Sequence, residues 1–384
     1  MSRLHRSASA QMSHPAISIQ NSGGWTFGSP SVLMMFHRQP GQLDRELAEM
    51  DECMPHYYRI TQGHGQGAEL LMNAEAAFMQ GNFSDAQILL EQTYSTIASN
   101  GQHNISLCCD FLAARLSLFQ ESVTFVKNPE VKRKELLSLH NMMWLNIFDS
   151  TYAYYYALIR MPEKIPALFK DHMLSTVSFL SPCRPMMEMI ENQVFLSQKM
   201  YAKVIGRSET LLPFCEKMHY ELVSLHVQIQ TAAAYAMLGK HHDARQLLLK
   251  ALGHAMPDGF LIPFVENYTY IKDVLSSINS IASELFTDRI LSLGSVYEQH
   301  CLRLSSRNSR PEILNMLNSR EAEIAALITD RLSNREIAER LFLSEGTVKQ
   351  YVNQIYSKLM INGDTRTKRK QLAELISSIN KGLT

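Results

Sequence analysis

The stretch from residue 317 to residue 370 constrains this 384-residue chain more than any other part of it. Asn318 precedes an apolar, periodic run and Glu321 follows three residues later, which is the pattern of an N-cap with its capping-box partner. Ser333 and Glu336 repeat the pattern, and a third helical run begins shortly afterwards. Helix starts this close together predict three short helices packed on one another.

The third helix, Ser344–Leu359, is predicted to have one apolar and one polar face. Its apolar side chains recur at helical spacing and are Val348, Val352, Ile355 and Leu359. The opposite face carries Thr347, Lys349, Gln350, Asn353 and Gln354. Lysine can donate to guanine O6 and N7, and Gln or Asn can pair with adenine. We therefore predict that this helix is a recognition helix that reads the major groove of double-stranded DNA.

Positive charge gathers near this helix, although the formal net charge of the whole chain is zero. Between Ser344 and Lys370 the acidic residues are Glu345 and Asp364. The basic residues of the same stretch are Lys349, Lys358, Arg366, Lys368, Arg369 and Lys370. All of these except Lys349 are expected to contact phosphates, together with Thr347 at the start of the helix.

The same stretch resembles the LuxR-type helix-turn-helix of bacterial transcription regulators. The residues that match the family's pattern are Leu317, Arg320, Glu321, Ser333, Asn334, Glu336, Ile337, Ala338, Leu341, Ser344, Thr347, Val348, Lys349, Lys358 and Leu359. Tyr351 stands where the family has His, and Asn318 stands where it has a capping Thr. The resemblance implies base contacts from Lys349, Gln350 and Asn353.

The resemblance also implies a fourth helix, which in this family often mediates dimerisation. Its apolar side is formed by Leu372, Leu375, Ile376 and Ile379. These residues would then join two copies on a two-fold DNA site. The alternative is that this side only closes the core of a four-helix domain. The sequence does not decide between dimerisation and core closure.

The remainder of the chain predicts an all-α protein. Residues 1–45 look irregular because they are rich in Gly and Pro, and residues 46–304 are almost entirely helix-like. Predicted helical patches include 131–160, 186–205 and 209–238, and alternating β-branched runs are scarce. The polar segment 305–311 is the expected linker, and the DNA-binding domain is expected to occupy residues 312–384.

Two patches of the helical region share the spacing of small residues around a glycine. The first register is Ala74, Ala77, Gly81, Ala86 and Leu90, and the second is Ala232, Tyr235, Gly239, Ala244, Leu248 and Ala251. Small residues let two antiparallel helices approach closely, and the glycine makes the turn between them. The spacing resembles the tetratricopeptide helix pair, and the alternative is two ordinary helical hairpins.

The helical region followed by the LuxR-type domain resembles the C-terminal part of MalT-like regulators. This implies that the helical region, residues 46–304 and here called the helical arm, senses a small molecule or a protein effector. The ATPase of those regulators is not expected here because no phosphate-binding loop of the type GxxxxGK[ST] occurs. A competing hypothesis is an interaction scaffold built on the arm, with a DNA-binding module that no longer functions.

Other classes of protein find little support in the sequence. The six cysteines form no CxxC pair and no zinc-ligand spacing, so we expect buried thiols and no metal site. No catalytic constellation or cofactor loop is present, so an enzyme is not expected. The most apolar window, residues 142–159, contains Asn146 and Asp149 and favours a buried helix over a membrane span. A cytoplasmic location is therefore predicted.

Overall fold

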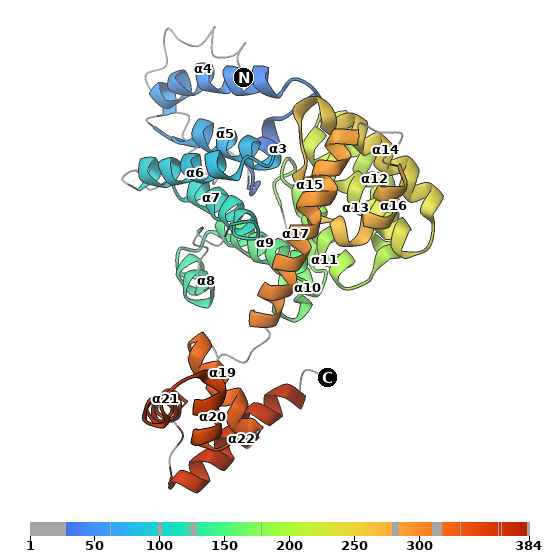
Figure 1. Ribbon diagram of the computed structural model, residues 1–384. Helices are drawn as coiled ribbons and strands as arrows, with labels where there is room; N and C mark the ends of the chain where they lie inside the picture. The colour runs from blue at the N-terminus through green and yellow to red at the C-terminus, as the bar shows by residue number, and fades with distance from the viewer. Residues whose placement is uncertain are drawn as a thin grey trace. The chain divides into compact units, whose positions relative to one another are not determined.

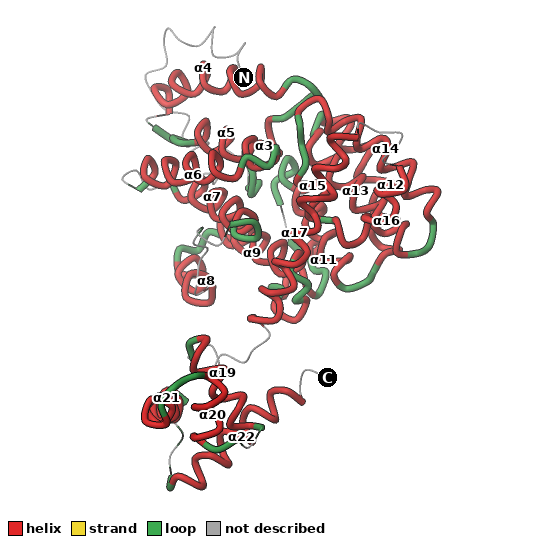
Figure 2. Tube along the Cα trace, viewed as in Figure 1, coloured by secondary structure: helices red, strands yellow, loops and turns green. Residues whose placement is uncertain are grey.

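The computed structural model describes residues 28–381, apart from 62, 99–101, 121–122, 124–128, 178, 279–283, 309–316, 331, 360 and 362. Within these residues every regular element is a helix and no strand occurs (Figures 1 and 2), which confirms the all-α prediction. The chain divides into two compact units, 1–302 and 303–384. No described helix is both long enough and apolar enough to cross a membrane.

The first unit is a stack of helices. Its α-helices are α3 (Val32–Phe36), α4 (Leu43–Thr61), α5 (Ala68–Met79), α6 (Phe83–Ile97), α7 (His103–Leu116), α8 (Pro129–Ser138), α9 (Met142–Leu158), α10 (Ala167–Lys170), α11 (Arg184–Ser197), α12 (Tyr201–Met218), α13 (Glu221–Met237), α14 (His241–Ala255), α15 (Ile262–Glu266), α16 (Tyr268–Ile278) and α17 (Glu284–Asn308). The described residues of this unit also form the 3-10 turns η1 (Pro162–Lys164), η2 (Leu174–Thr176) and η3 (Met256–Asp258). Because α17 continues to Asn308, it includes part of the expected linker.

The two segments with shared small-residue spacing each form a helical hairpin. α5 packs on α6, and α13 packs on α14. The turns contain Gly81 and Gly239, both at positive φ, where glycine is favoured. Ala86 and Ala244 are fully buried where the paired helices meet. The hairpins are therefore present, while the tetratricopeptide character of the whole stack stays a prediction.

Three of the predicted helical patches are each divided in two by a residue in the left-handed conformation. His140 separates α8 from α9, Lys199 separates α11 from α12, and His219 separates α12 from α13. None of the three is glycine, which usually occupies this position at helix ends. The breaks therefore carried no glycine or proline signal in the sequence.

The last part of the expected irregular segment is ordered and buried. Ser31 caps α3 by accepting a hydrogen bond from the Met34 amide, and Val32 and Leu33 are fully buried. The amide of Leu33 donates to the Glu75 carboxylate of α5 at 2.6 Å. An apolar pentapeptide with a capped start thus forms a core helix despite the surrounding Gly and Pro.

Contacts between distant parts of the chain join the earlier helices of this stack, α4–α9, to η3 and α15. The amides of Gly41 and Leu43 donate to the buried Asp258 carboxylate at 2.6 and 3.0 Å. Deeper inside, Arg115 of α7 forms an ion pair with Glu266 of α15, and both side chains are almost completely buried. The Nε–Oε1 distance of that pair is 2.7 Å, and Tyr154 of α9 donates to the same carboxylate at 2.8 Å.

Helix α17 runs along the boundary between α4–α9 and α11–α16 (Figure 1). Tyr297 stacks on Phe119 with ring centroids 4.8 Å apart, and the Glu298 carboxylate accepts a bond from Thr269 of α16 at 2.7 Å. Gly294 lets the helix lie against the Tyr268 ring, because a Cβ there would be 2.2 Å from a ring carbon. The part of α17 that belongs to the first unit is therefore packed on both α4–α9 and α11–α16.

The stability of the first unit should depend on pH through Glu75. Burial raises the pKa of this carboxyl from 4.5 to about 7, against the opposing effect of the Leu33 amide and Arg115. The folded protein therefore binds a proton that the unfolded chain releases between these values, so stability falls as pH rises through this window. Relative to Glu75→Gln, the wild type should lose about 2 kcal/mol of unfolding free energy between pH ~5 and pH ~7.5.

Urea unfolding of both proteins at the two pH values measures this difference. Glu135→Gln, which changes an exposed carboxylate, is the matched control and should follow the wild type. If Glu75→Gln shows the same pH dependence as the wild type, Glu75 is ionised in the folded protein throughout the window.

Candidate nucleic-acid interface

The second unit contains four described helices, and the first three have side-chain caps at their starts. They are α19 (Ser319–Thr329), α20 (Asn334–Leu341), α21 (Glu345–Lys358) and α22 (Thr365–Lys381). Asn318 with Glu321 and Ser333 with Glu336 form complete capping boxes, as the sequence indicated. Ser344 caps α21 by accepting a bond from the Thr347 amide at 3.0 Å. These caps fix where each helix begins.

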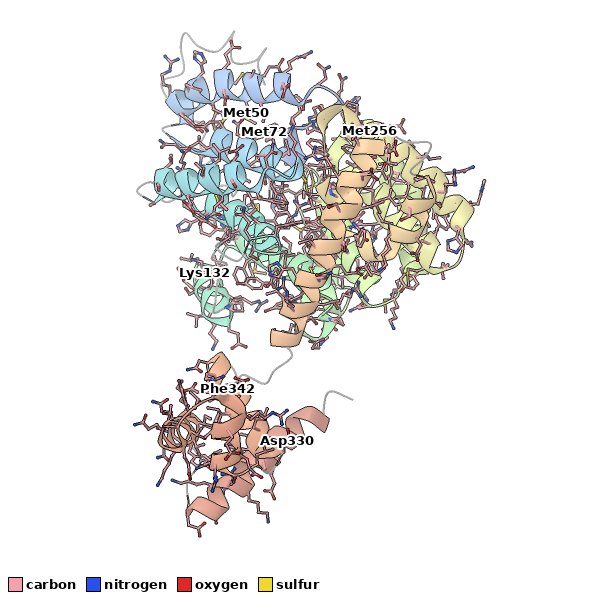
Figure 3. The ribbon with its side chains drawn as sticks, in the orientation of Figure 1. Met50, Met72, Lys132, Met256, Asp330 and Phe342 are labelled. Carbon is pink, nitrogen blue, oxygen red and sulfur yellow. The ribbon has the colours of Figure 1, made fainter. Side chains whose placement is uncertain are left out.

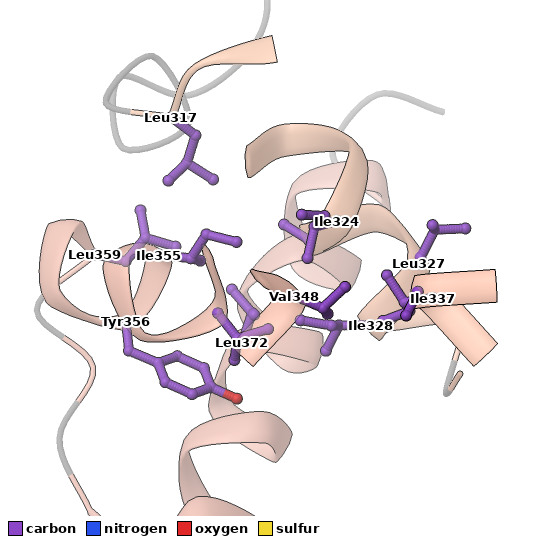
Figure 4. Close-up of a cluster of buried hydrophobic side chains, with 13 residues drawn as sticks. Leu317, Ile324, Leu327, Ile328, Ile337, Val348, Ile355, Tyr356, Leu359 and Leu372 are labelled. Atoms are coloured by element: carbon purple, nitrogen blue, oxygen red, sulfur yellow. The ribbon is translucent and has the colours of Figure 1, made fainter. Parts of the chain in front are cut away.

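The apolar sides of the four helices meet in one core. Val348, Val352, Ile355 and Leu359 of the α21 region are all buried there, as predicted. Figure 4 shows Ile355 and Leu359 beside Leu317, with Val348 close to Ile328 of α19. Because this face of α21 is turned inward, its opposite face is fixed toward solvent.

The turn between α20 and α21 has an unusual residue at its centre. Phe342, which is labelled in Figure 3, adopts the left-handed conformation with φ 54°, and the residue is 95% exposed. Its amide donates to the Ala338 carbonyl and so ends α20. Arg320 of α19 donates to the carbonyl of Leu341 at 2.8 Å. Arg320 matches the family pattern in the sequence, but no local signal there marks this role in the turn.

The solvent side of α21 presents the predicted base-reading residues together. Lys349, Gln350, Asn353 and Gln354 are all exposed. Thr347 is half-buried, and its hydroxyl lies 2.7 Å from that of Ser344. One ammonium group and three carboxamides on one helix face supply both donors and acceptors, which is the chemistry that reads base edges.

Two of the basic residues expected to contact phosphates are engaged inside the domain. Lys358 donates to the Glu321 carboxylate at 2.7 Å. Arg369 donates to Asn334 Oδ1 at 3.0 Å and also to the Leu332 carbonyl. Lys368 lies over the Tyr356 ring, 5.9 Å from its centroid. The side chain of Arg366 lies outside the described residues, and Lys370 is exposed.

The Glu321 carboxylate is buried and accepts hydrogen bonds from two different helices' ends. It is 1% exposed and accepts from the Asn318 amide at 2.7 Å in addition to Lys358. Burial opposes its ionisation, but the bonds from Lys358 and Asn318 outweigh burial and hold the pKa of Glu321 below its ordinary value. The last turn of α21 is thereby tied to the first turn of α19.

The apolar side of α22 lies at least partly against its own domain. Leu372 is fully buried in the core, and Leu375 is partly buried against it. For Leu372 this packing favours the core-closing alternative. The side chains of Ile376 and Ile379 lie outside the described residues, so their role in dimerisation stays a prediction.

Comparison with known proteins shows which family the second unit resembles. The family described as "Bacterial regulatory proteins, luxR family" matches residues 315–369. The transcriptional regulatory protein LnrK of Bacillus subtilis is 44% identical over 57 residues, which are 15% of this chain and 26% of LnrK. DegU of Brevibacillus brevis, also a transcriptional regulatory protein, is 45% identical over 53 residues, which are 14% of this chain and 22% of DegU.

A third relative, the HTH-type transcriptional regulator AlkS of Alcanivorax borkumensis, is 28% identical over 101 residues, or 25% of this chain and 12% of AlkS. The chain thus spans about a quarter or less of the length of these relatives. No solved structure matches it. The C-terminal part of the chain carries a LuxR-family helix-turn-helix domain.

Lys358→Met should separate a structural role of Lys358 from a phosphate contact. Removing the ammonium leaves the buried Glu321 carboxylate short of a partner, so we expect the domain to lose roughly 1–2 kcal/mol of stability. The slope of log affinity for DNA against log salt should stay unchanged, because no phosphate contact is lost. Thermal unfolding and a salt titration of DNA binding measure the two quantities.

The double variant Glu321→Gln/Lys358→Met should lose less stability than the sum of the two single variants, because the two side chains interact directly. A salt slope that falls by about one in Lys358→Met would instead establish the phosphate contact that the sequence predicted.

Proposed function

We propose that this chain is a transcription regulator that binds double-stranded DNA through α21. The observation that carries the proposal is the exposed group Lys349, Gln350, Asn353 and Gln354, held on one helix face by the buried opposite face. The LuxR-family match over residues 315–369 supports the same reading. The helix would enter the major groove, where each base pair presents a distinct pattern of donors and acceptors.

The remaining contacts would come from residues around this face. Thr347 and the basic residues Arg366, Lys368 and Lys370 are proposed to bind phosphates. For Lys358 and Arg369, the internal bonds described above support a positioning role for α21 and α20. Two copies would bind a two-fold site, with Leu375, Ile376 and Ile379 as the proposed contacts between them, and the chain would act in the cytoplasm.

We further propose that the helical arm senses a small molecule or a protein partner. Its support is the architecture, in which distant segments are joined through Asp258 and the Arg115–Glu266 pair into one body. A ligand that favours one packing of such a body can bias the state of the whole unit. The resemblance to MalT-like regulators is consistent with this role.

Lys349→Ala and Asn353→Ala should each weaken specific DNA binding by about 1–3 kcal/mol, because each removes a bidentate base contact. Both side chains are exposed, so the stability of the domain should not change. Capture of genomic fragments by the full-length protein at ~150 mM salt identifies sites for the measurement. Gln371→Ala, which removes an exposed polar side chain from α22, is the matched control.

Enriched, partly palindromic sites that the Lys349→Ala/Asn353→Ala double variant fails to capture are the expected result. Equally weak capture by the wild type and the double variant would reject the placement of the recognition face. The interaction scaffold would then be the better description, and its partners should persist when residues 311–384 are deleted.

A further inference from the structure

Gly346 lies in the exposed stripe of α21 although it offers no side chain to DNA. With 3.6 residues per turn, Gly346, Gln350, Asn353 and Ser357 follow one another along the same face, and all four are exposed. Lys349 lies directly beside this line. Gly346 therefore occupies the end of the same surface that carries the proposed base-reading side chains.

The free domain gives no reason for glycine at this position. The residue is helical and its φ is not positive, and the nearest atom to an added Cβ would be Ser344 Oγ at 3.7 Å, an ordinary contact. Gly294 shows the contrasting case, because there a Cβ would collide with the Tyr268 ring. Glycine inside a helix lowers stability relative to alanine. Gly346 is the second residue of α21, where glycine has a lower helix propensity than alanine, and it brings no packing benefit in the unbound domain.

We infer that Gly346 is a specificity-determining position at which a base edge approaches the main chain of the recognition helix. Glycine is the residue that permits a close approach of backbone to a ligand. The exposed carboxylate of the neighbouring Glu345 disfavours a phosphate at this place, whereas a base edge carries no charge. The first turn of α21 would then lie deeper in the groove than a larger residue allows.

This inference rests on the proposed DNA binding, and Gly346→Ala in the full-length protein tests it. The variant should stabilise α21, seen as slower amide hydrogen exchange across the helix, while specific DNA affinity falls about tenfold. Gly346→Leu should lose more affinity than Gly346→Ala because its side chain is larger. Selection from a random DNA pool should show an altered preference at one base pair per half-site, with the salt slope unchanged.

Gly253→Ala in α14 is the matched control. Gly253 is also helical and exposed, and an added Cβ there meets nothing within 4 Å. This control should slow exchange in its own helix and leave DNA affinity unchanged. It separates the general effect of replacing glycine from an effect at the DNA surface.

Three outcomes would overturn the inference. Gly346→Ala with slower exchange but unchanged affinity and base preference would show that nothing approaches Gly346. A reduced salt slope with unchanged base preference would identify the neighbour as a phosphate. If the wild type binds no specific DNA, or if Lys349→Ala/Asn353→Ala binds as the wild type does, the proposed function fails first and the inference falls with it.

Discussion

The surface proposed to read DNA is tied to the rest of its domain through one buried carboxylate. Glu321 closes the capping box of α19 and also receives the ammonium of Lys358 from the end of α21. A carboxylate at 1% exposure is stable only when its charge is compensated, and here the compensating group belongs to α21. The same interaction that lets Glu321 stay ionised therefore ties the end of α21 to the start of α19.

The helical arm also contains a buried ionic interaction, which involves more elements of the fold. Its interior holds the Arg115 guanidinium against Glu266 and Tyr154, surrounded by the rings of Phe78 and Phe111. An ion pair this deep contributes little net stability compared with an apolar replacement, but leaving either charge alone is very costly. The pair therefore favours one arrangement of α7, α9 and α15 over shifted packings. Such specificity suits a unit proposed to respond to an effector.

The sequence predicted the DNA-binding domain well because its signals are local. The capping boxes at Asn318 and Ser333 and the apolar spacing of α21 each lie within a few residues, and all three appear in the structure. The arm was harder because its helix breaks at His140, Lys199 and His219 are left-handed without glycine. Tertiary packing imposes these turns, as it imposes the intramolecular partners of Lys358 and Arg369. The sequence alone does not show whether a charged side chain will bind a phosphate of DNA or a carbonyl group of its own domain.

The tie between residues 41–43 and Asp258 has a consequence for the order of events during synthesis. The segment that begins the described chain is held by a carboxylate that the ribosome adds 217 residues after Gly41. Closing so long a loop is entropically costly and slows folding relative to local hairpins such as α5–α6. The hairpins can form as they emerge, but the arm as a whole can close only after η3 and α15 have been made. Before that point α3 already has α5 and α13 to pack on, so the segment just after it, residues 41–43, is the part whose partner is made late.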